Sequence, residues 1–184
     1  IVPGLMLSAP RDRQHLVSVL NEAVDINDRP TVIRYSKDPM PDDIRVVASH
    51  DGLDVLRDGP GDGILLVAHG QLCAPALAAV DQLDFPVRVV SPRWSLPVCR
   101  GLIEEAAEAR AVVSVEDGLV VSGLGSHLAD ALSRRGLWRP IRNLGIPQRY
   151  LGHDSRSAIM AELGLDAPGI ADAVSQLVSQ LGGE

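Results

Sequence analysis

The sequence predicts an α/β fold, with a mostly parallel sheet between two layers of helices. Two observations support this prediction. Over about 120 residues from Ile64 onward, short aliphatic runs alternate with stretches whose apolar residues recur at helical spacing, as in parallel sheets crossed by helices. Hydrophobic residues make up 46% of the 184 residues and aromatic residues only 3%, so aliphatic side chains must build the core.

The strands expected in this region are apolar runs bounded by charged or turn residues. They are residues 64–68, 87–91, 112–115 and 140–144. The expected helices carry an apolar stripe at helical spacing. They are residues 73–82, residues 98–109, a helix from Ser126, a helix capped by Asp154 or Ser155 that ends at Gly164, and a last helix from Pro168 to Gly182.

The first part of the chain predicts a smaller unit. Residues 5–7 and 31–35 read as strands and residues 12–24 as an amphipathic helix between them. Two strands cannot close a core, so we expect residues 1–36 to form only part of a sheet, with an apolar edge left open or covered by another chain. Residues 36–62 are rich in proline, glycine and aspartate, which indicates a connector, with short strands at 44–47 and near Val55.

The stretch from Val112 to Leu132 is the strongest candidate for a site. Its strand leads into Glu116 and Asp117, and a glycine loop then leads to a helix for which Ser126 is the expected N-cap. A nucleotide-binding loop would use Gly123 and Gly125 to bring a phosphate against the helix N-terminus. That fingerprint needs a third glycine or alanine where Leu128 stands. The alternative is that the glycines only let the loop turn and the acids stay solvated.

Charge and cysteine usage exclude other classes of protein. The net charge of −7 argues against a nucleic-acid partner, and no apolar run approaches the 18 residues or so that a membrane helix needs. Cys73 and Cys99 show no metal-binding or CxxC spacing, which predicts small buried or half-buried residues in a reducing, cytoplasmic compartment. The chain begins at Ile1 without an initiator methionine, which suggests a piece of a longer protein.

Three further candidates have ordinary explanations. Gly61-Asp62-Gly63 matches the start of the metal motif of thiamine-diphosphate enzymes, but the asparagine pair that continues this motif is missing, so we interpret it as a turn. His69 and His127 lie nearest the expected C-terminal edge of the sheet. We predict that each is packed or solvated rather than catalytic.

Several spaced motifs resemble one family. They are Ser91–Trp94 with Pro97, Val115–Gly118, Gly125–Ser126, Asn143–Pro147 with His153, Ser155 and Arg156, Ala161–Asp166, and Gly169–Ala171. The first three are similar to the C-terminal domain of transketolase-like thiamine enzymes, and the others resemble 1-deoxy-D-xylulose-5-phosphate synthases more narrowly. Pro30–Tyr35 resembles the strand that closes the pyrimidine-binding domain of that family, so the resemblance spans the chain.

The resemblance implies a division of the chain and a function. Residues 1–42 would be the end of a pyrimidine-binding domain, residues 43–62 a linker, and residues 63–184 a three-layer αβα transketolase-like C-terminal domain. The intact enzyme would be a cytoplasmic homodimer that condenses pyruvate with glyceraldehyde 3-phosphate, with loss of CO2, for isoprenoid and thiamine precursors. Its thiamine diphosphate, Mg2+ and catalytic residues would belong to the missing N-terminal region, so we expect no catalytic, cofactor or metal residue here.

Two other functions remain open at this level. One is a stand-alone nucleotide- or anion-binding α/β module that uses Gly123 to Ser126. The other is a beta-type subunit of a thiamine-dependent ketoacid dehydrogenase. The first hypothesis treats the chain as a fragment or split subunit of the synthase.

Lys37 is the single substrate-binding candidate, and it is the only lysine among seventeen basic residues. The family has a Pro-Arg-Gly run where this chain reads Ser36-Lys37-Asp38, and the resemblance implies that this arginine binds the phosphate of the triose substrate. Lysine keeps the charge but loses the bidentate fork. The alternative is a solvated charge at a strand end. The family also usually has aspartate where Ser91 and Gln148 stand, which puts the activity of the parent enzyme in doubt.

Overall fold

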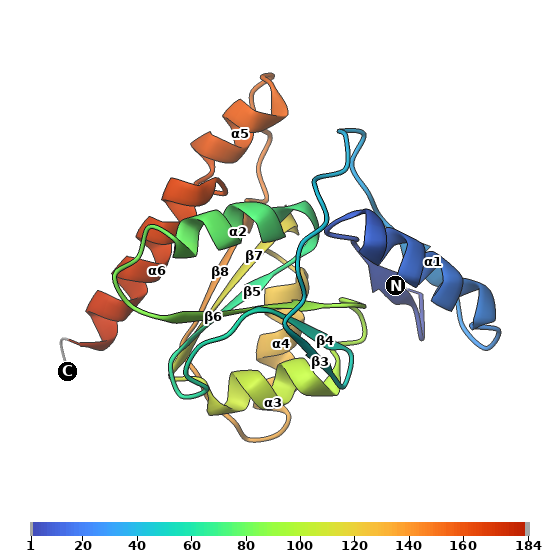
Figure 1. Cartoon of the computed structure of the whole chain (residues 1–184), viewed down its shortest axis with the longest axis horizontal. Helices are drawn as coiled ribbons and strands as arrows, with labels where there is room; N and C mark the ends of the chain where they lie inside the picture. The colour runs from blue at the N-terminus through green and yellow to red at the C-terminus, as the bar shows by residue number, and fades with distance from the viewer. Residues whose placement is uncertain (1, 183–184) are drawn as a thin grey trace.

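The computed structural model describes residues 2–182 and contains two sheets (Figure 1). The smaller sheet is two-stranded and parallel, formed by β1 (Met6–Ser8) and β2 (Thr31–Ile33), which α1 (Arg13–Asp25) connects. The larger sheet is six-stranded, in the order β3-β4-β6-β5-β7-β8. Its strands are β3 (Ala48–His50), β4 (Leu53–Arg57), β5 (Ile64–Ala68), β6 (Val87–Pro92), β7 (Ala111–Leu119) and β8 (Ile141–Ile146).

The large sheet is mostly parallel, as predicted. Strands β6, β5, β7 and β8 run in one direction, and β4 and β3 add an antiparallel edge. Leu66 in β5 stands opposite Val89 in β6 and Val113 in β7, so β-branched and aliphatic side chains meet across the parallel strands. All five residues of β5 are buried, because helices cover both faces of a parallel sheet.

Helices form the two outer layers, so the three-layer prediction is confirmed (Figure 1). After a short 3-10 turn, η1 (Gly70–Leu72), α2 (Cys73–Val80) packs with α6 (Ala167–Leu181) on one face. α3 (Arg100–Glu108) and α4 (Leu124–Ser133) cover the other face. Each face has its own core, with Leu66 and Val113 on the side of α2 and α6, and Leu65 and Val112 on the side of α3 and α4. The last helix, α5 (Arg156–Glu162), precedes α6.

Local side-chain capping explains where three of the six α-helices between residues 2 and 182 begin. The Asp12 side chain accepts from the His15 N–H at the start of α1, at 2.7 Å. Of the two caps expected for α5 the structure uses Ser155, whose Oγ accepts from the Ala158 N–H at 3.2 Å. Asp166 caps α6 in the same way, and Gly164 ends α5 with a φ of 67°.

Two predictions around β7 are wrong. Ser126 is not an N-cap, because α4 begins at Leu124 and the Ser126 hydroxyl donates to the Val120 carbonyl at 2.7 Å. The expected strand 112–115 also extends to Leu119, which pairs with Ile146 of β8 beyond a register shift. The two acids therefore lie within the strand, near its C-terminal end.

The connector predicted over residues 43–62 contains two strands of the large sheet. The strand expected at 44–47 is wrong, and β3 forms at residues 48–50 instead, while the strand near Val55 is confirmed as β4. A two-residue turn joins them, with φ values of 44° at Asp51 and 81° at Gly52, which suits the twist of a tight hairpin. Gly61–Gly63 forms the predicted turn, where the Gly63 N–H donates to the Pro60 carbonyl at 3.1 Å.

The smaller unit, β1-α1-β2, is docked on the large sheet through a buried polar cluster. The Arg11 guanidinium is 3.0 Å from the Asp12 carboxylate and 2.8 Å from the Asp54 carboxylate, and all three side chains are buried. One guanidinium faces two carboxylates, and hydrogen bonds from the His15 and Ile44 N–H groups to Asp12 and from the Ser49 hydroxyl to Asp54 supply further partners that a buried charge needs. The smaller sheet has only two strands, so the prediction that residues 1–36 form part of a sheet is confirmed. Leu7 of β1 also makes an isolated antiparallel bridge to Leu96. That the apolar edge of this sheet is left open or covered by another chain stays a prediction.

Candidate functional site

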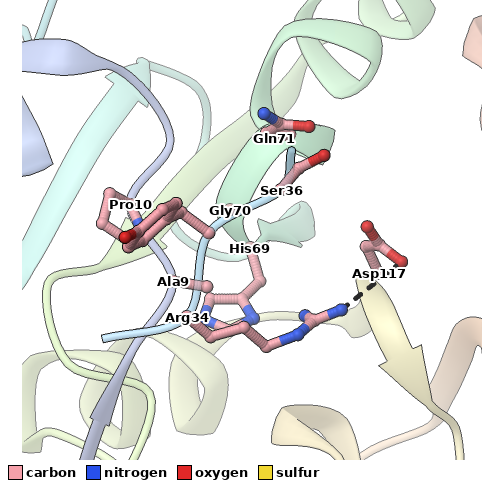
Figure 2. A pocket seen from close by; sticks show the side chains of 9 residues that line it. Ala9, Pro10, Arg34, Ser36, His69, Gly70, Gln71 and Asp117 are labelled. Atoms are coloured by element: carbon pink, nitrogen blue, oxygen red, sulfur yellow. Dashed lines mark ion pairs between the residues drawn. The ribbon is translucent and has the colours of Figure 1, made fainter. Parts of the chain in front are cut away.

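The C-terminal ends of β2, β5 and β7 meet where the smaller unit adjoins the large sheet. A cavity of about 190 Å³ lies there, and Figure 2 shows the side chains that line it. They come from four places in the sequence: Ala9 and Pro10 after β1, Arg34 to Ser36 after β2, His69 to Gln71 after β5, and Asp117 near the end of β7. A second cavity of about 510 Å³ shares Arg34 and His69 and continues over Glu116 to the start of α4. This groove is the candidate site, because ligands of open α/β sheets bind at the carboxyl edge of the strands.

Glu116 occupies the N-terminus of α4. Its side chain is buried, and its Oε1 accepts from the Gly125 N–H at 3.3 Å. Burial raises the pKa of Glu116, and hydrogen bonds from the Leu124 and Gly125 amides oppose that rise. A Cβ at Gly123 would overlap the Glu116 carboxylate, so an internal contact accounts for this glycine. The carboxylate fills the position that a phosphate would take, which argues against a nucleotide-binding loop at Gly123 to Ser126.

His69 is the buried floor of both cavities. Its side chain is 6% exposed, and its Nε2 has no hydrogen-bond partner among residues 2–182. Burial, and then the positive charge of Arg34, lower the pKa of His69 to about 4, so the ring is neutral at pH 7. Of the two states expected for His69, packed or solvated, the structure shows the packed one, and the expectation that it is not catalytic stays a prediction. His127, on α4, is half-buried and lines the larger cavity.

Asp117 connects both parts of the groove. One of its oxygens lies 3.6 Å from the Arg34 guanidinium, the pair marked in Figure 2. The other oxygen forms an ion pair with Arg156, at the start of α5. Arg156 in turn is 3.3 Å from the Asp38 carboxylate, in the segment after β2. Consecutive ion pairs thus join four charged residues. Arg34 and Asp38 lie in the segment after β2, Asp117 lies in β7 of the large sheet, and Arg156 lies at the start of α5.

Lys37 lies in this segment, between Ser36 and Asp38, and its side chain is exposed. Within residues 2–182 it forms no ion pair, whereas Asp38 beside it does. Its predicted role in binding phosphate stays a prediction.

The other sequence candidates lie away from the groove or inside the core. Ser91 is buried in β6 and accepts from the Cys73 thiol at 3.4 Å, and burial raises the pKa of that thiol to about 12. Cys99 is half-buried, so both cysteines are placed as predicted. Gln148 is exposed after β8.

Two arginines of the groove belong to the motifs that carry the family resemblance but were not predicted as site residues. Arg34 directly follows β2 and could have been found by the rule that strand ends carry site residues. Arg156 carried no such signal, because only the fold brings it to Asp117, 39 positions earlier in the chain.

The fold and the groove place the chain in a class of α/β proteins. In this class, the C-terminal ends of the parallel strands of one domain face a second sheet, of which this chain holds two strands. Residues 53–170 match the family model of the transketolase C-terminal domain. This match covers well over half of the chain, so the chain belongs to the transketolase C-terminal domain family.

Among the proteins of this family, the chain is clearly similar to 1-deoxy-D-xylulose-5-phosphate synthases. Over all 184 residues the chain is 90% identical to a 1-deoxy-D-xylulose-5-phosphate synthase of Cutibacterium acnes, and it is 44% identical to 1-deoxy-D-xylulose-5-phosphate synthase 2 of Streptomyces avermitilis. All of the chain is covered in both comparisons, but it spans only 29% of each relative's length. The resemblance to this group of synthases is therefore confirmed for the part of the protein that the chain represents.

Solved structures agree on the fold. A structure described as a split gene transketolase, inactive beta4 tetramer, is 27% identical, with a TM-score of 0.79 over 96% of this chain and 57% of its own. A transketolase from Pichia stipitis has a TM-score of 0.72 over 99% of this chain and 26% of its own, and at 15% identity it supports the fold alone.

Proposed function

We propose that this chain is the C-terminal part of a 1-deoxy-D-xylulose-5-phosphate synthase. The enzyme would condense pyruvate with glyceraldehyde 3-phosphate, release CO2 and supply a precursor for isoprenoid and thiamine synthesis. The observation that carries the proposal is the 90% identity to such a synthase along the whole chain. That identity also favours the synthase over the beta-type subunit of a ketoacid dehydrogenase.

The cofactor of this enzyme would be thiamine diphosphate, bound together with Mg2+. The thiamine group would supply the carbanion stabilisation that loss of CO2 from pyruvate requires. Within residues 2–182, histidine, cysteine, aspartate and glutamate do not gather in groups of three or more that could hold a metal ion. Glu116 and Asp117, the acids nearest the groove, are engaged by the α4 amides and by arginines. These residues do not fit the diphosphate–metal site, so we propose that the rest of the protein supplies it.

Within the intact enzyme, the role we propose for this chain is to bind the phosphorylated substrate. Lys37 would donate a charge-assisted hydrogen bond to the phosphate of glyceraldehyde 3-phosphate, worth roughly 1.5 to 3 kcal/mol. Lys37→Ala should therefore raise the KM for that substrate about tenfold or more, at about 1.4 kcal/mol per decade. The KM for pyruvate should barely change, and Lys37→Arg should be tolerated. An equal effect on both substrates, or none, would leave Lys37 as a solvated charge.

A chimeric enzyme tests the proposed function. The 184 residues replace the matching 29% of the Cutibacterium acnes synthase, and formation of 1-deoxy-D-xylulose 5-phosphate is measured with thiamine diphosphate and Mg2+. We expect activity within about threefold of the parent, because the segments are so similar. A folded chimera that binds the cofactor but forms no product would contradict the proposal.

We also propose that the chain alone is inactive and binds thiamine diphosphate no better than a buffer control does. The inactive tetramer of the split gene transketolase supports this proposal by analogy. Tight, Mg2+-dependent binding in calorimetry would contradict it.

The proposed partners are the N-terminal region of the same protein and a second copy in a cytoplasmic homodimer. No helix between residues 2 and 182 has both the length and the apolar content to cross a bilayer.

A further inference from the structure

The ion pairs that join Arg34, Asp117, Arg156 and Asp38 hold the segment of the backbone that carries Lys37. The segment 34–38 is tied to Asp117 at both ends, directly through Arg34 and indirectly through Asp38 and Arg156. Within the segment, the Ser36 hydroxyl donates to the Asp38 carboxylate at 3.0 Å and accepts from the Asp38 N–H at 3.0 Å. Lys37 stands between these two linked residues, so its backbone position depends on the contacts of its neighbours.

The charges of the four ion-paired residues balance one another, which leaves Lys37 as the cation of this segment without an ion pair within residues 2–182. Arg34 and Arg156 balance Asp38 and Asp117, whereas Lys37 forms no ion pair within residues 2–182. The central side chain, Asp117, is 20% exposed, so solvent screens its pairs less than it would screen a surface pair. A lysine whose backbone is held by its neighbours and whose side chain is unpaired keeps its charge available for an anion from outside.

We propose that Asp117 and Arg156 are positioning residues for the phosphate of the aldehyde substrate. They belong to β7 and α5 of the large α/β domain, and they fix the segment after β2 so that Lys37 meets the phosphate in one place. This inference rests on the proposed function. It assigns the C-terminal domain a part in substrate selection, through the contact between Asp117 and Arg34, which lie about 80 residues apart in sequence.

The test uses the chimeric enzyme with two aldehydes, glyceraldehyde 3-phosphate and D-glyceraldehyde, which differ only in the phosphate. Asp117→Asn and Arg156→Gln should each raise the KM for glyceraldehyde 3-phosphate about three- to tenfold. The constants for D-glyceraldehyde and pyruvate should change less than twofold. Asp130→Asn, which breaks the exposed Asp130–Arg134 pair on α4, is the matched control and should change none of them. Asp117→Glu should restore part of the lost phosphate preference.

A double-mutant cycle separates positioning from a merely structural role. When Lys37 is already alanine, Asp117→Asn should cause no further rise in the KM for glyceraldehyde 3-phosphate. Equal losses with both aldehydes, or losses that add to those of Lys37→Ala, would overturn the positioning role. If Asp117→Asn does not fold, Arg156→Gln carries the same comparison. An inactive but folded parent chimera would instead overturn the proposed function, and with it the substrate named here.

Discussion

The two buried histidines should make this chain sensitive to acid. His15, in the first turn of α1, belongs to the buried polar cluster around Arg11. Its Nδ1 accepts from the Arg11 backbone N–H at 3.4 Å, and its Nε2 faces the Arg93 carbonyl at 3.1 Å. In that arrangement the ring is neutral, with its proton on Nε2, and a second proton would point at Arg11. Burial, and then the charge of Arg11, lower the pKa of His15 to about 4, the value also reached by His69.

The direction and the size of this change in stability with pH follow from proton linkage. Each histidine binds protons more tightly in the unfolded chain, where its pKa is about 6.5, than in the folded chain. The contribution of each neutral histidine to the free energy of unfolding is therefore fully present above about pH 6.5 and declines as the pH falls toward 4. For one histidine with these two values the free energy of unfolding drops by about 2 kcal/mol between pH 7.5 and pH 5, so the pair should cost about 4 kcal/mol.

Urea unfolding at pH 7.5, 6 and 5 measures this loss. His15→Gln and His69→Gln should each remove about half of the pH dependence, even though either change also alters stability at pH 7.5. His153→Gln is the control, because His153 is exposed. A free energy of unfolding that stays constant from pH 7.5 to 5, or that keeps its full slope in both variants, would refute this reasoning.

Three further predictions concern stability, each measured by urea unfolding at pH 7.5. Ser122→Gly should stabilise the chain by about 1 kcal/mol, because Ser122 has a φ of 63° in the left-handed region, and a loss of stability would contradict this. Gly123→Ala should destabilise by more than about 1 kcal/mol, because its Cβ would overlap the Glu116 carboxylate. Gly152→Ala, with no atom within 4 Å of the new Cβ, should stay within about 0.5 kcal/mol. Leu66→Ala should cost about 2–5 kcal/mol, because Leu66 is fully buried between both neighbouring strands, and a smaller loss would indicate a core that collapses around the cavity.

Much of the fold could be predicted because the relevant signals are local. The strand over residues 64–68 is a continuous apolar run, and Ser155 and Asp166 cap helices through atoms three residues away. The β3–β4 hairpin was the main exception, since all three residues of its edge strand β3 are exposed and the strand has no apolar run. The Asp51-Gly52 pair was nevertheless a usable turn signal.

The site was predictable only in outline. Strand ends pointed to Glu116, Asp117 and the segment of Lys37, because parallel strands gather their carboxyl ends at one edge whatever the packing. The capping of α4 was wrong for a tertiary reason. The helix begins at Leu124, two residues before the serine expected to cap it, and the carboxylate of Glu116, nine residues before Gly125, accepts from the Gly125 N–H in its first turn.

The sequence by itself therefore determined the class of fold, the order of most elements and the family resemblance, all of which depend on residue type and short spacing. Only the tertiary structure decided the charge states and partners. His69 is neutral because the packed chain excludes water from it, and Asp117 joins Arg34 to Arg156 because folding brings three distant segments to one edge. Burial and long-range ion pairs depend on distances in space, which spacing along the chain does not encode.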